Sequence, residues 1–345
     1  MVIFPDLTYR LLTGFMILVL GGVLPLPAHG REAAAVDWQS DYPARHRLTG
    51  RIWDVADKRF VTPATLYQRM YGADFVLLGE VHANPDHHAL QGRVIERLVA
   101  AGRRPAVVFE MFERNQQAII ERAREDSADR IGSATRMDAR GWPWRLYKPL
   151  VETVMALDLP IIGADLPRAT VKRIVAKKLD ALDIKRVRAL ALDQPLSRRD
   201  SDIMRADIVA AHCGYTPHAR LDGMIAAQRA RDAMLADALI ARGQGDGAVL
   251  IAGSGHVRND LAVPAYLRQR APGKHIASVA FTEVNGGKPA PDDYLRGAAA
   301  DGEASEGLWD YLWFTPGSQP PDPCAAFEKR LRRLRQPESR SNGAE

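Results

Sequence analysis

The sequence predicts an α/β fold, in which a mainly parallel β-sheet carries helices on both faces and is extended by a helical insertion or cap. First, short apolar runs rich in strand-forming residues alternate with longer amphipathic stretches, as in sheets built from right-handed crossovers. Second, these runs are apolar at successive positions, which indicates strands covered on both faces. Third, 345 residues, 46% of them hydrophobic, suffice for one large core or two modest ones.

Seven runs are predicted to form strands. In chain order they are Ile52–Val55, Phe75–Gly79, Ala106–Met111, Leu159–Asp165, Gly247–Gly253, Ile276–Phe281 and the aromatic run Gly307–Pro316. Two stretches between them, Asp86–Ala101 and Leu221–Arg242, have the apolar spacing of amphipathic helices. Asn84 followed by Pro85 is a typical helix start. Residues 168–214 have no clear strand pattern and are rich in Leu, Ala, Arg and Asp at helical spacing, so they are expected to form the helical insertion.

The two ends of the chain are predicted to lie outside the α/β domain. Residues 11–28 contain no Asp, Glu, Lys or Arg, and small residues follow at Ala28 and Gly30. We interpret residues 1–30 as a cleaved signal peptide, which predicts export to the periplasm. An uncleaved membrane anchor is the alternative, and no cysteine is placed for lipid attachment. The domain then covers residues 31–316, and residues 317–345 form a Pro-rich break, a short basic helix and a flexible tail.

Composition and missing motifs exclude several classes of protein. The net charge of +5 is too small and too dispersed to indicate nucleic-acid binding. The only cysteines are Cys213 and Cys324, which an exported chain could pair, although the sequence leaves this open. There is no CxxC, HExxH, GxSxG or Walker A motif, and no GxGxxG after the first strand. Thiolate zinc, covalent haem, nucleophile-elbow, P-loop and dinucleotide sites are therefore not expected.

Polar side chains follow four of the predicted strands, at the edge where α/β sheets bind ligands. The residues at these strand ends are Glu80 and His82, Glu110, Asp165 with Arg168 nearby, and Ser254 with His256. Two Gly-x-x-His segments, "GEVH" and "GSGH", are far apart in sequence and would lie close together if their strands were neighbours. Any one of these residues alone is better explained by a helix cap, an ion pair or a satisfied loop histidine.

Taken together, the strand ends predict a metal site. Imidazole and carboxylate are ligands suited to Zn, Mn, Co or non-haem Fe, so Glu80, His82, Glu110 and His256 are the candidate ligands of one divalent ion. If the protein is an enzyme, the same four residues are its candidate catalytic groups. Supporting residues are expected around them: His87, His88, Asp165, Arg168, Ser254, Gln228 and Arg231. For His87 and His88 the alternative is an ordinary surface position.

A second constellation lies in "GWPWRLYKPLVE", residues 141–152. It combines flat apolar side chains, two cations and a phenol, which are Trp142, Trp144, Arg145, Tyr147 and Lys148. A porphyrin needs flat apolar contacts, cations for its propionates and an axial ligand. The segment therefore predicts part of a haem face, with Tyr147 as the candidate axial ligand. The alternative is an aromatic helix start packed on the core.

Several segments together resemble the ChaN family of haem-binding, iron-regulated proteins of the Tiki superfamily. The resemblance runs from about Phe75 to Phe314 and rests on "LLGEVHANPDHH", "VVFEMF", "LPIIGADLPR", "AHCGYTP", "AAQRARDAM" and "IAGSGHVRNDLAVP". It implies an α/β sheet flanked by helices, non-covalent haem binding, often with two protomers holding haems face to face, and a role in iron acquisition at the envelope beside an outer-membrane haem uptake system. Two features depart from the family: no lipid-attachment cysteine is present, and Asp165 stands where an Asn is expected.

The superfamily also contains metal-dependent proteases and hydrolases with paired Gly-x-x-His motifs, which correspond here to Gly79–His82 and Gly253–His256. The resemblance therefore implies an exported haem-binding protein as the leading function, and a metal-dependent hydrolase using Glu80, His82, Glu110 and His256 as the competing one. Both can hold at once, and a scaffold that keeps an old site without turnover is a third class. The sequence does not decide whether the protein is an enzyme.

Overall fold

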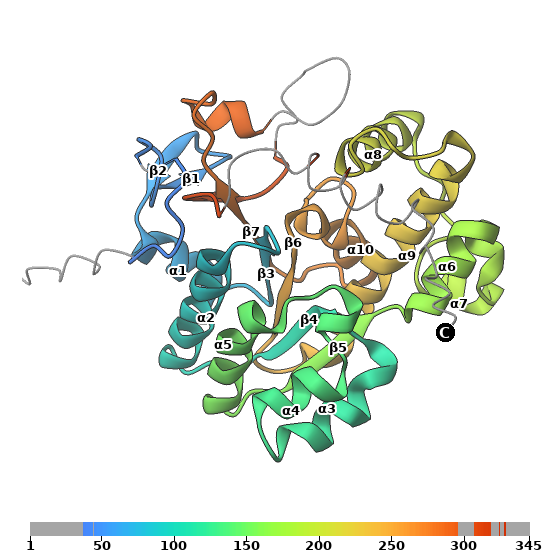
Figure 1. Cartoon of the computed structure of the whole chain (residues 1–345), viewed down its shortest axis with the longest axis horizontal. Helices are drawn as coiled ribbons and strands as arrows, with labels where there is room; N and C mark the ends of the chain where they lie inside the picture. The colour runs from blue at the N-terminus through green and yellow to red at the C-terminus, as the bar shows by residue number, and fades with distance from the viewer. Residues whose placement is uncertain (1–36, 44, 296–306, 319–323, 325–327, 329–345) are drawn as a thin grey trace, which may run out of the picture. The chain divides into compact units, whose positions relative to one another are not determined.

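The computed structural model describes residues 37–43, 45–295, 307–318, 324 and 328 (Figure 1). The predicted signal peptide lies outside the described residues, as does the predicted basic helix apart from Glu328. An eight-stranded sheet has the order β2-β1-β8-β7-β3-β6-β4-β5. The pairs from β8 to β5 are parallel, whereas β1 is antiparallel to both β2 and β8. The predicted fold class is confirmed.

All seven predicted strands are present, and one was missed. The strands are β1 Ile52–Asp54, β2 Arg59–Val61, β3 Phe75–Glu80, β4 Ala106–Glu113, β5 Ile161–Asp165, β6 Ala248–Gly253, β7 Ile276–Glu283 and β8 Tyr311–Thr315. The missed strand, β2, has three residues and none of them is buried, so it shows no apolar pattern.

The helices alternate with the parallel strands as predicted. They are α1 Pro63–Tyr71, α2 Pro85–Ala100, α3 Gln117–Arg124, α4 Ala128–Ala134, α5 Trp144–Ala156, α6 Arg168–Lys177, α7 Ile184–Ala189, α8 Arg198–Ala211, α9 His218–Arg242 and α10 Val263–Arg270. Short 3-10 turns occur at η1 Arg114–Gln116, η2 Asp138–Arg140, η3 Lys178–Ala181, η4 Ser254–Val257 and η5 Pro291–Tyr294.

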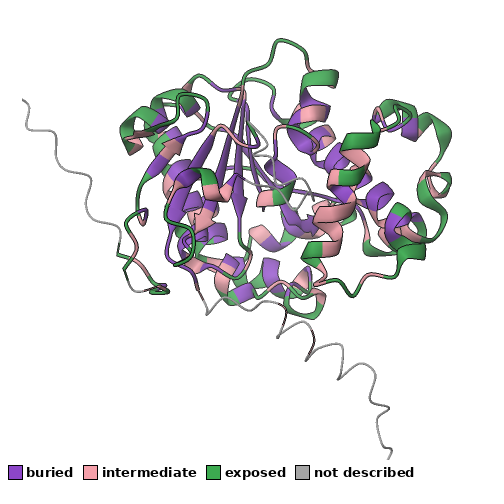
Figure 2. Cartoon of the chain, turned by 90° about the horizontal axis from the view of Figure 1, so that it is seen from above, coloured by how far each residue is buried: buried purple, intermediate pink, exposed green. Residues whose placement is uncertain are grey.

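Successive side chains of the central strands enter two different cores. Val76 and Leu78 of β3 are buried in a cluster with α1 to α5, whereas Phe75 and Leu77 are buried in a cluster with α6, α7, α9 and α10. Because both faces are covered, the strands are buried along their whole length, as Figure 2 shows. This is why the strands read as continuous apolar runs in the sequence.

The helical insertion packs on the outer side of α9. Residues 168–214 form α6, η3, α7 and α8 with no strand among them. Gly223 of α9 allows α6 to approach closely, since a Cβ at this position would lie 1.9 Å from the backbone oxygen of Val175. Helix α8 buries only Met204. A disulfide between Cys213, just after α8, and Cys324 joins this region to the C-terminal segment.

Among the described residues, no helix has both the length and the apolar composition that a membrane crossing requires.

Candidate functional site

The two Gly-x-x-His segments lie side by side, because β3 and β6 are neighbours with Glu80 opposite Gly253. Their glycines are required by this close packing. A Cβ on Gly253 would lie 2.9 Å from His82 Cε1, and a Cβ on Gly79 would lie 2.4 Å from Val257 Cγ2. Strand β4 pairs with the other side of β6 and delivers Glu110 to the same edge. The predicted convergence of strand ends is therefore present.

One half of the site is built around Glu80, whose side chain is fully buried. Its Oε1 accepts hydrogen bonds from the Tyr147 hydroxyl (2.7 Å) and His82 Nδ1 (2.8 Å), and its Oε2 accepts one from Gln91 Nε2 (2.8 Å). His88 Nδ1 lies 3.3 Å from Oε2. Burial acts to raise the pKa of Glu80, but the charge on His88 and the hydrogen bonds from His82 and His88 outweigh it and hold that pKa well below its usual range.

The other half is built around Glu110, also fully buried. It accepts hydrogen bonds from Arg231 Nη2 (2.7 Å) and from the backbone N–H of Gly253 (2.8 Å). Arg231 reaches from α9 and also donates to both carboxylate oxygens of Asp165 at the end of β5. Despite burial, His256, His82 and Arg231 lower the pKa of Glu110 well below its usual value.

His256 lies between two carboxylates. Its Nδ1 is 2.6 Å from Asp232 Oδ1, and its Nε2 is 3.3 Å from Glu110 Oε1. Burial favours the neutral ring, but Glu110 and Asp232 raise the pKa of His256 to about 10. Burial raises the pKa of Asp232. His256 is thus a buried cation near neutral pH, fixed at both nitrogens.

His82 differs from the other site histidines in exposure. Its side chain is 40% exposed, whereas those of His88 and His256 are 2% and 6% exposed. Its Nδ1 is held by Glu80, and its ring packs edge-on against Trp142 with centroids 4.8 Å apart. Burial lowers the pKa of His82, but Glu110 and Glu80 raise it by more.

A cavity of about 630 Å³ lies above this edge of the sheet. Its floor contains Glu80, His82, Glu110 and the segment Gly253–His256. Helix α8 and its C-terminal end form one wall, with Met204, Asp207, Ile208, Ala211 and His212. Further apolar lining comes from Leu261, Ala262, Leu308 and Trp309. The cavity therefore combines a charged, hydrogen-bonded floor with a largely apolar wall.

The geometry does not support the predicted metal site. The four predicted ligands do lie at one edge, but three of them are bound to protein groups: Glu80 to Tyr147 and Gln91, Glu110 to Arg231 and Gly253, and His256 to Asp232. Within the described part of the chain, no group of three or more His, Cys, Asp or Glu residues is arranged to hold a metal ion. The convergence of these residues at one edge of the sheet was predicted correctly. Arginine and histidine side chains, in place of the predicted metal ion, balance the charge of the carboxylates.

The five residues of the predicted haem face do not share one surface. Trp144 Nε1 and Lys148 Nζ both bind Asp129 of α4, at 3.0 and 2.6 Å, so these side chains point toward α4. Arg145 is exposed, and Trp142 is half-buried beside His82. The predicted single surface is corrected accordingly, because the helix α5 distributes its side chains between a neighbouring helix and the site.

Tyr147 lies at the bottom of the site, where it is 1% exposed and its hydroxyl donates to Glu80. Burial and the nearby carboxylates Glu80 and Glu110 raise its pKa far above the usual value for a phenol. An axial ligand would need the opposite, an accessible phenolate. We therefore assign Tyr147 a role in holding Glu80 in place of the predicted role as iron ligand.

The remaining predicted residues take separate places. His88 lies against Tyr147 and Glu80, whereas His87 is a core residue: it accepts from the Val81 N–H, and burial lowers its pKa to about 3. Gln228 Nε2 is 3.2 Å from His256 Nδ1, and Ser254 lines the cavity. Arg168 is exposed at the start of α6 and does not line the cavity.

Several site residues were not predicted as such, including Gln91, Asp232, Met204, Ile208, His212 and Arg258. Asp232 adjoins the predicted Arg231 in sequence, which is the one signal that points to it. The α8 residues come from an insertion whose placement over the sheet depends on tertiary packing. Tyr215, in the loop after α8, is 45% exposed, and its N–H donates to the carbonyl of the wall residue His212.

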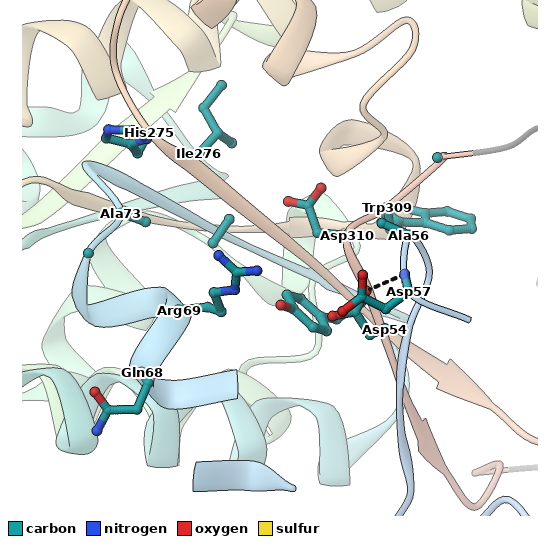
Figure 3. A pocket seen from close by; sticks show the side chains of 14 residues that line it. Asp54, Ala56, Asp57, Gln68, Arg69, Ala73, His275, Ile276, Trp309 and Asp310 are labelled. Carbon is teal, nitrogen blue, oxygen red and sulfur yellow. Dashed lines mark hydrogen bonds between the residues drawn. The ribbon is translucent and has the colours of Figure 1, made fainter. Parts of the chain in front are cut away.

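A second cavity of about 510 Å³ lies at the opposite edge of the sheet, near the first residue of β7 (Figure 3). Asp54, Arg69, His275 and Asp310 are among its lining residues. Asp310 accepts hydrogen bonds from Asn259 Nδ2 and the Ser278 N–H. The carboxylate of Asp310 is thus bound within the protein, and we assign this cavity no function.

Comparison with known proteins identifies relatives of this fold. A family model described as "Haem-binding uptake, Tiki superfamily, ChaN" matches residues 66–267, more than half of the chain. A solved structure described as "Cofacial heme binding to ChaN of Campylobacter jejuni" has a TM-score of 0.59 at 20% identity, covering 78% of this chain and 97% of that one.

More distant structures are also found. An open form of a mutant erythromycin esterase EreC has a TM-score of 0.44 at 13% identity, covering 75% of this chain and 94% of that one. The type III effector HopBA1 has a TM-score of 0.40 at 12% identity, with 73% and 92% covered. No curated protein matches the chain.

Proposed function

We propose, from the premise that the chain belongs to the ChaN family of haem-binding proteins in the Tiki superfamily, that it binds haem non-covalently in the cavity above β3, β4 and β6. The observation that carries this proposal is the position of His82. It is the cavity-floor histidine with an accessible ring, and it faces a space walled by apolar residues of α8. Ligand sites are concave, mostly apolar and supplied with a few fixed polar groups.

The chemistry of His82 suits an axial ligand of haem iron. Its Nδ1 is held by Glu80, and Nε2 has no hydrogen-bond partner among the described residues. A carboxylate on the second ring nitrogen orients an imidazole ligand and raises its basicity. Haem would supply an iron that binds a nitrogen of this kind. Tyr147, by holding the same carboxylate, fixes the ring direction from below.

The wall of the cavity suits the porphyrin face. Met204 and Ile208 lie one turn apart on α8, and Leu261 and Leu308 add apolar surface. Of the four large hydrophobic side chains that are exposed in the described residues, Val81 lines the cavity and Tyr215 follows its α8 wall. A bound porphyrin would remove apolar surface of this kind from water, at about 25 cal/mol per Å².

The two arginines that line the cavity are both paired with carboxylates. Arg231 is bound to Asp165 and Glu110, and Arg258 is bound to Asp207 and Asp260. Because both lining arginines already have carboxylate partners, neither is expected to hold a propionate of a bound haem.

We further propose an exported protein of haem or iron acquisition at the cell envelope. The signal-peptide pattern of residues 1–30 supports export, and the paired cysteines Cys213 and Cys324 suit an oxidising compartment. Partners in this proposal are haem, an outer-membrane haem uptake system and a second copy of the chain facing the haem. N-terminal sequencing of exported protein should begin near residue 31, and retention of residues 11–24 in a membrane pellet would favour an anchor.

A metal-dependent hydrolase is the less favoured alternative, since the described residues offer no metal-ligand cluster and their carboxylates bind arginine, histidine and backbone donors.

Hemin titration, followed at the Soret band, tests the proposal. Wild type should bind saturably, and His82→Ala should change the band and weaken binding at least about tenfold, the scale of losing a ligand contact of about 1.4 kcal/mol. His212→Ala and Tyr215→Phe are the matched variants on the wall and rim. If one of these alters the band and His82→Ala does not, haem is held from the C-terminal end of α8 or the loop after it, and the floor assignment is refuted. If wild type does not bind, the haem proposal fails.

A further inference from the structure

We infer that the outer surface of the helical insertion docks on an anionic lipid bilayer. We call this surface the basic cap and define it as residues 168–205, from the start of α6 to the first half of α8. The inference stands apart from haem binding, because it rests on the charge and exposure of residues outside the cavity floor.

The basic cap has a larger net positive charge than the whole chain. Residues 168–205 contain eleven Lys and Arg against five Asp and Glu, a net charge of +6, whereas the full 345-residue chain has +5. The remaining residues are thus close to neutral as a set. A charge concentrated in one insertion creates a local field that the net charge of the chain does not reveal.

Most of these cations are not used inside the protein. Lys178 and Arg205 bind Asp222, and Arg186 lies near Asp237. The other eight are exposed, and none of them has a carboxylate within 4.0 Å among the described residues: Arg168, Lys172, Arg173, Lys177, Lys185, Arg188, Arg198 and Arg199. These side chains are available to an external anionic partner.

The packing of α6 and α7 directs the exposed cations of these two helices outward. Ile174 of α6, Val187 of α7 and Leu190, directly after α7, are buried in one cluster with α9. The two helices lie on the far side of α9 from the sheet (Figure 1), and outer residues of this region are exposed (Figure 2). The surface therefore faces away from the rest of the domain.

An apolar tip distinguishes a lipid surface from other anionic partners. Ile184, the first residue of α7, is 58% exposed, the most exposed of the large hydrophobic side chains in the described residues. It stands directly beside Lys185, with Arg188 one turn on. A cationic helix that presents an exposed apolar residue is the arrangement that binds at the headgroup boundary of anionic bilayers. A nucleic acid or an acidic peptide would bind the cations but gain little from Ile184.

The basic cap also connects with the haem cavity. Arg198 and Arg199 are in the first turn of α8, and Met204, Asp207 and Ile208 further along the same helix line the cavity. Docking through the cap would therefore bring the cavity wall near the bilayer.

Vesicle co-sedimentation tests the inference with the purified exported chain. Vesicles of phosphatidylcholine with about one third phosphatidylglycerol should bind it at about 0.05 M salt and release it at about 0.5 M, where charges are screened within a few ångströms. The Lys185→Glu/Arg188→Glu variant should partition at least about 30-fold less, since the loss of each of the two cations costs about fivefold at an anionic surface and the two new negative charges add repulsion. The matched control is Arg122→Glu/Arg130→Glu on α3 and α4, with the same change of charge, and it should bind as wild type does.

Ile184→Ser separates lipid from other anions. It should weaken vesicle binding several-fold and leave binding to polyglutamate unchanged. The inference is overturned if wild type does not bind the anionic vesicles, if the control variant loses as much binding as the Lys185/Arg188 variant, or if Ile184→Ser has no effect on vesicles. In the last case, if the wild type also binds polyglutamate as tightly as it binds the vesicles, the partner would be an acidic polypeptide.

Discussion

Replacing Tyr147 by Phe removes one hydroxyl from the bottom of the site and keeps the ring. The hydroxyl donates to Glu80 Oε1 at 2.7 Å, and the residue is 1% exposed, so water cannot take its place. Glu80 keeps its bonds from His82 and Gln91. The variant therefore separates two roles, because an iron ligand is needed for the haem spectrum whereas a brace for Glu80 is needed for stability.

The expected loss of stability follows from the type of bond. A hydrogen bond to a charged group contributes about 1.5–3 kcal/mol. For a chain of this length, 1 kcal/mol corresponds to about 1.5 °C in melting temperature. Tyr147→Phe should therefore melt about 2–5 °C below wild type.

Thermal unfolding followed by circular dichroism, together with hemin titration, measures both roles. Tyr147→Phe should melt lower and show the same Soret maximum as wild type. A shifted Soret maximum with an unchanged melting temperature would refute the reasoning and return Tyr147 to the role of ligand.

Gly253→Ala should weaken hemin binding at least about tenfold, because the new Cβ would lie 2.9 Å from His82 Cε1. Gly255→Ala is the control, since a Cβ at that position would have no atom within 4 Å. Equal losses of hemin affinity in the two variants would contradict the packing argument. The pKa of His256 is raised to about 10. The stability that its charged ring contributes should therefore be complete below about pH 6.5 and be lost as the pH rises through about 10. Urea unfolding across this window should show a decline in unfolding free energy that His256→Gln lacks. Cys213→Ser/Cys324→Ser should cost about 2–4 kcal/mol of unfolding free energy, and an unchanged urea midpoint would show that non-covalent contacts alone anchor α8.

The parts of the structure that the sequence could predict depend on local pattern. Apolar runs ending in polar residues revealed β3, β4 and β6, and the carboxyl-edge rule then brought Glu80, Glu110 and His256 together. Strand β2 was missed because three partly exposed residues leave no pattern.

The parts that could not be predicted depend on tertiary packing. The direction of each α5 side chain, and hence the burial of Tyr147, depends on where α4 and the site lie around the helix. Whether a carboxylate binds a metal or a protein donor is likewise decided by distant residues, as when Arg231 of α9 reaches Glu110. The pairing of Cys213 with Cys324 was open for the same reason.

The central claim is that haem lies in the cavity above the carboxyl ends of β3, β4 and β6. A crystal of the hemin-bound protein, with anomalous scattering measured at the iron edge, tests it most directly. The account predicts one iron peak in this cavity, about 2 Å from His82 Nε2, as expected for an iron–imidazole bond. An iron peak at bonding distance from the Tyr147 hydroxyl, or one in the cavity that contains Asp54 and Asp310, would contradict it.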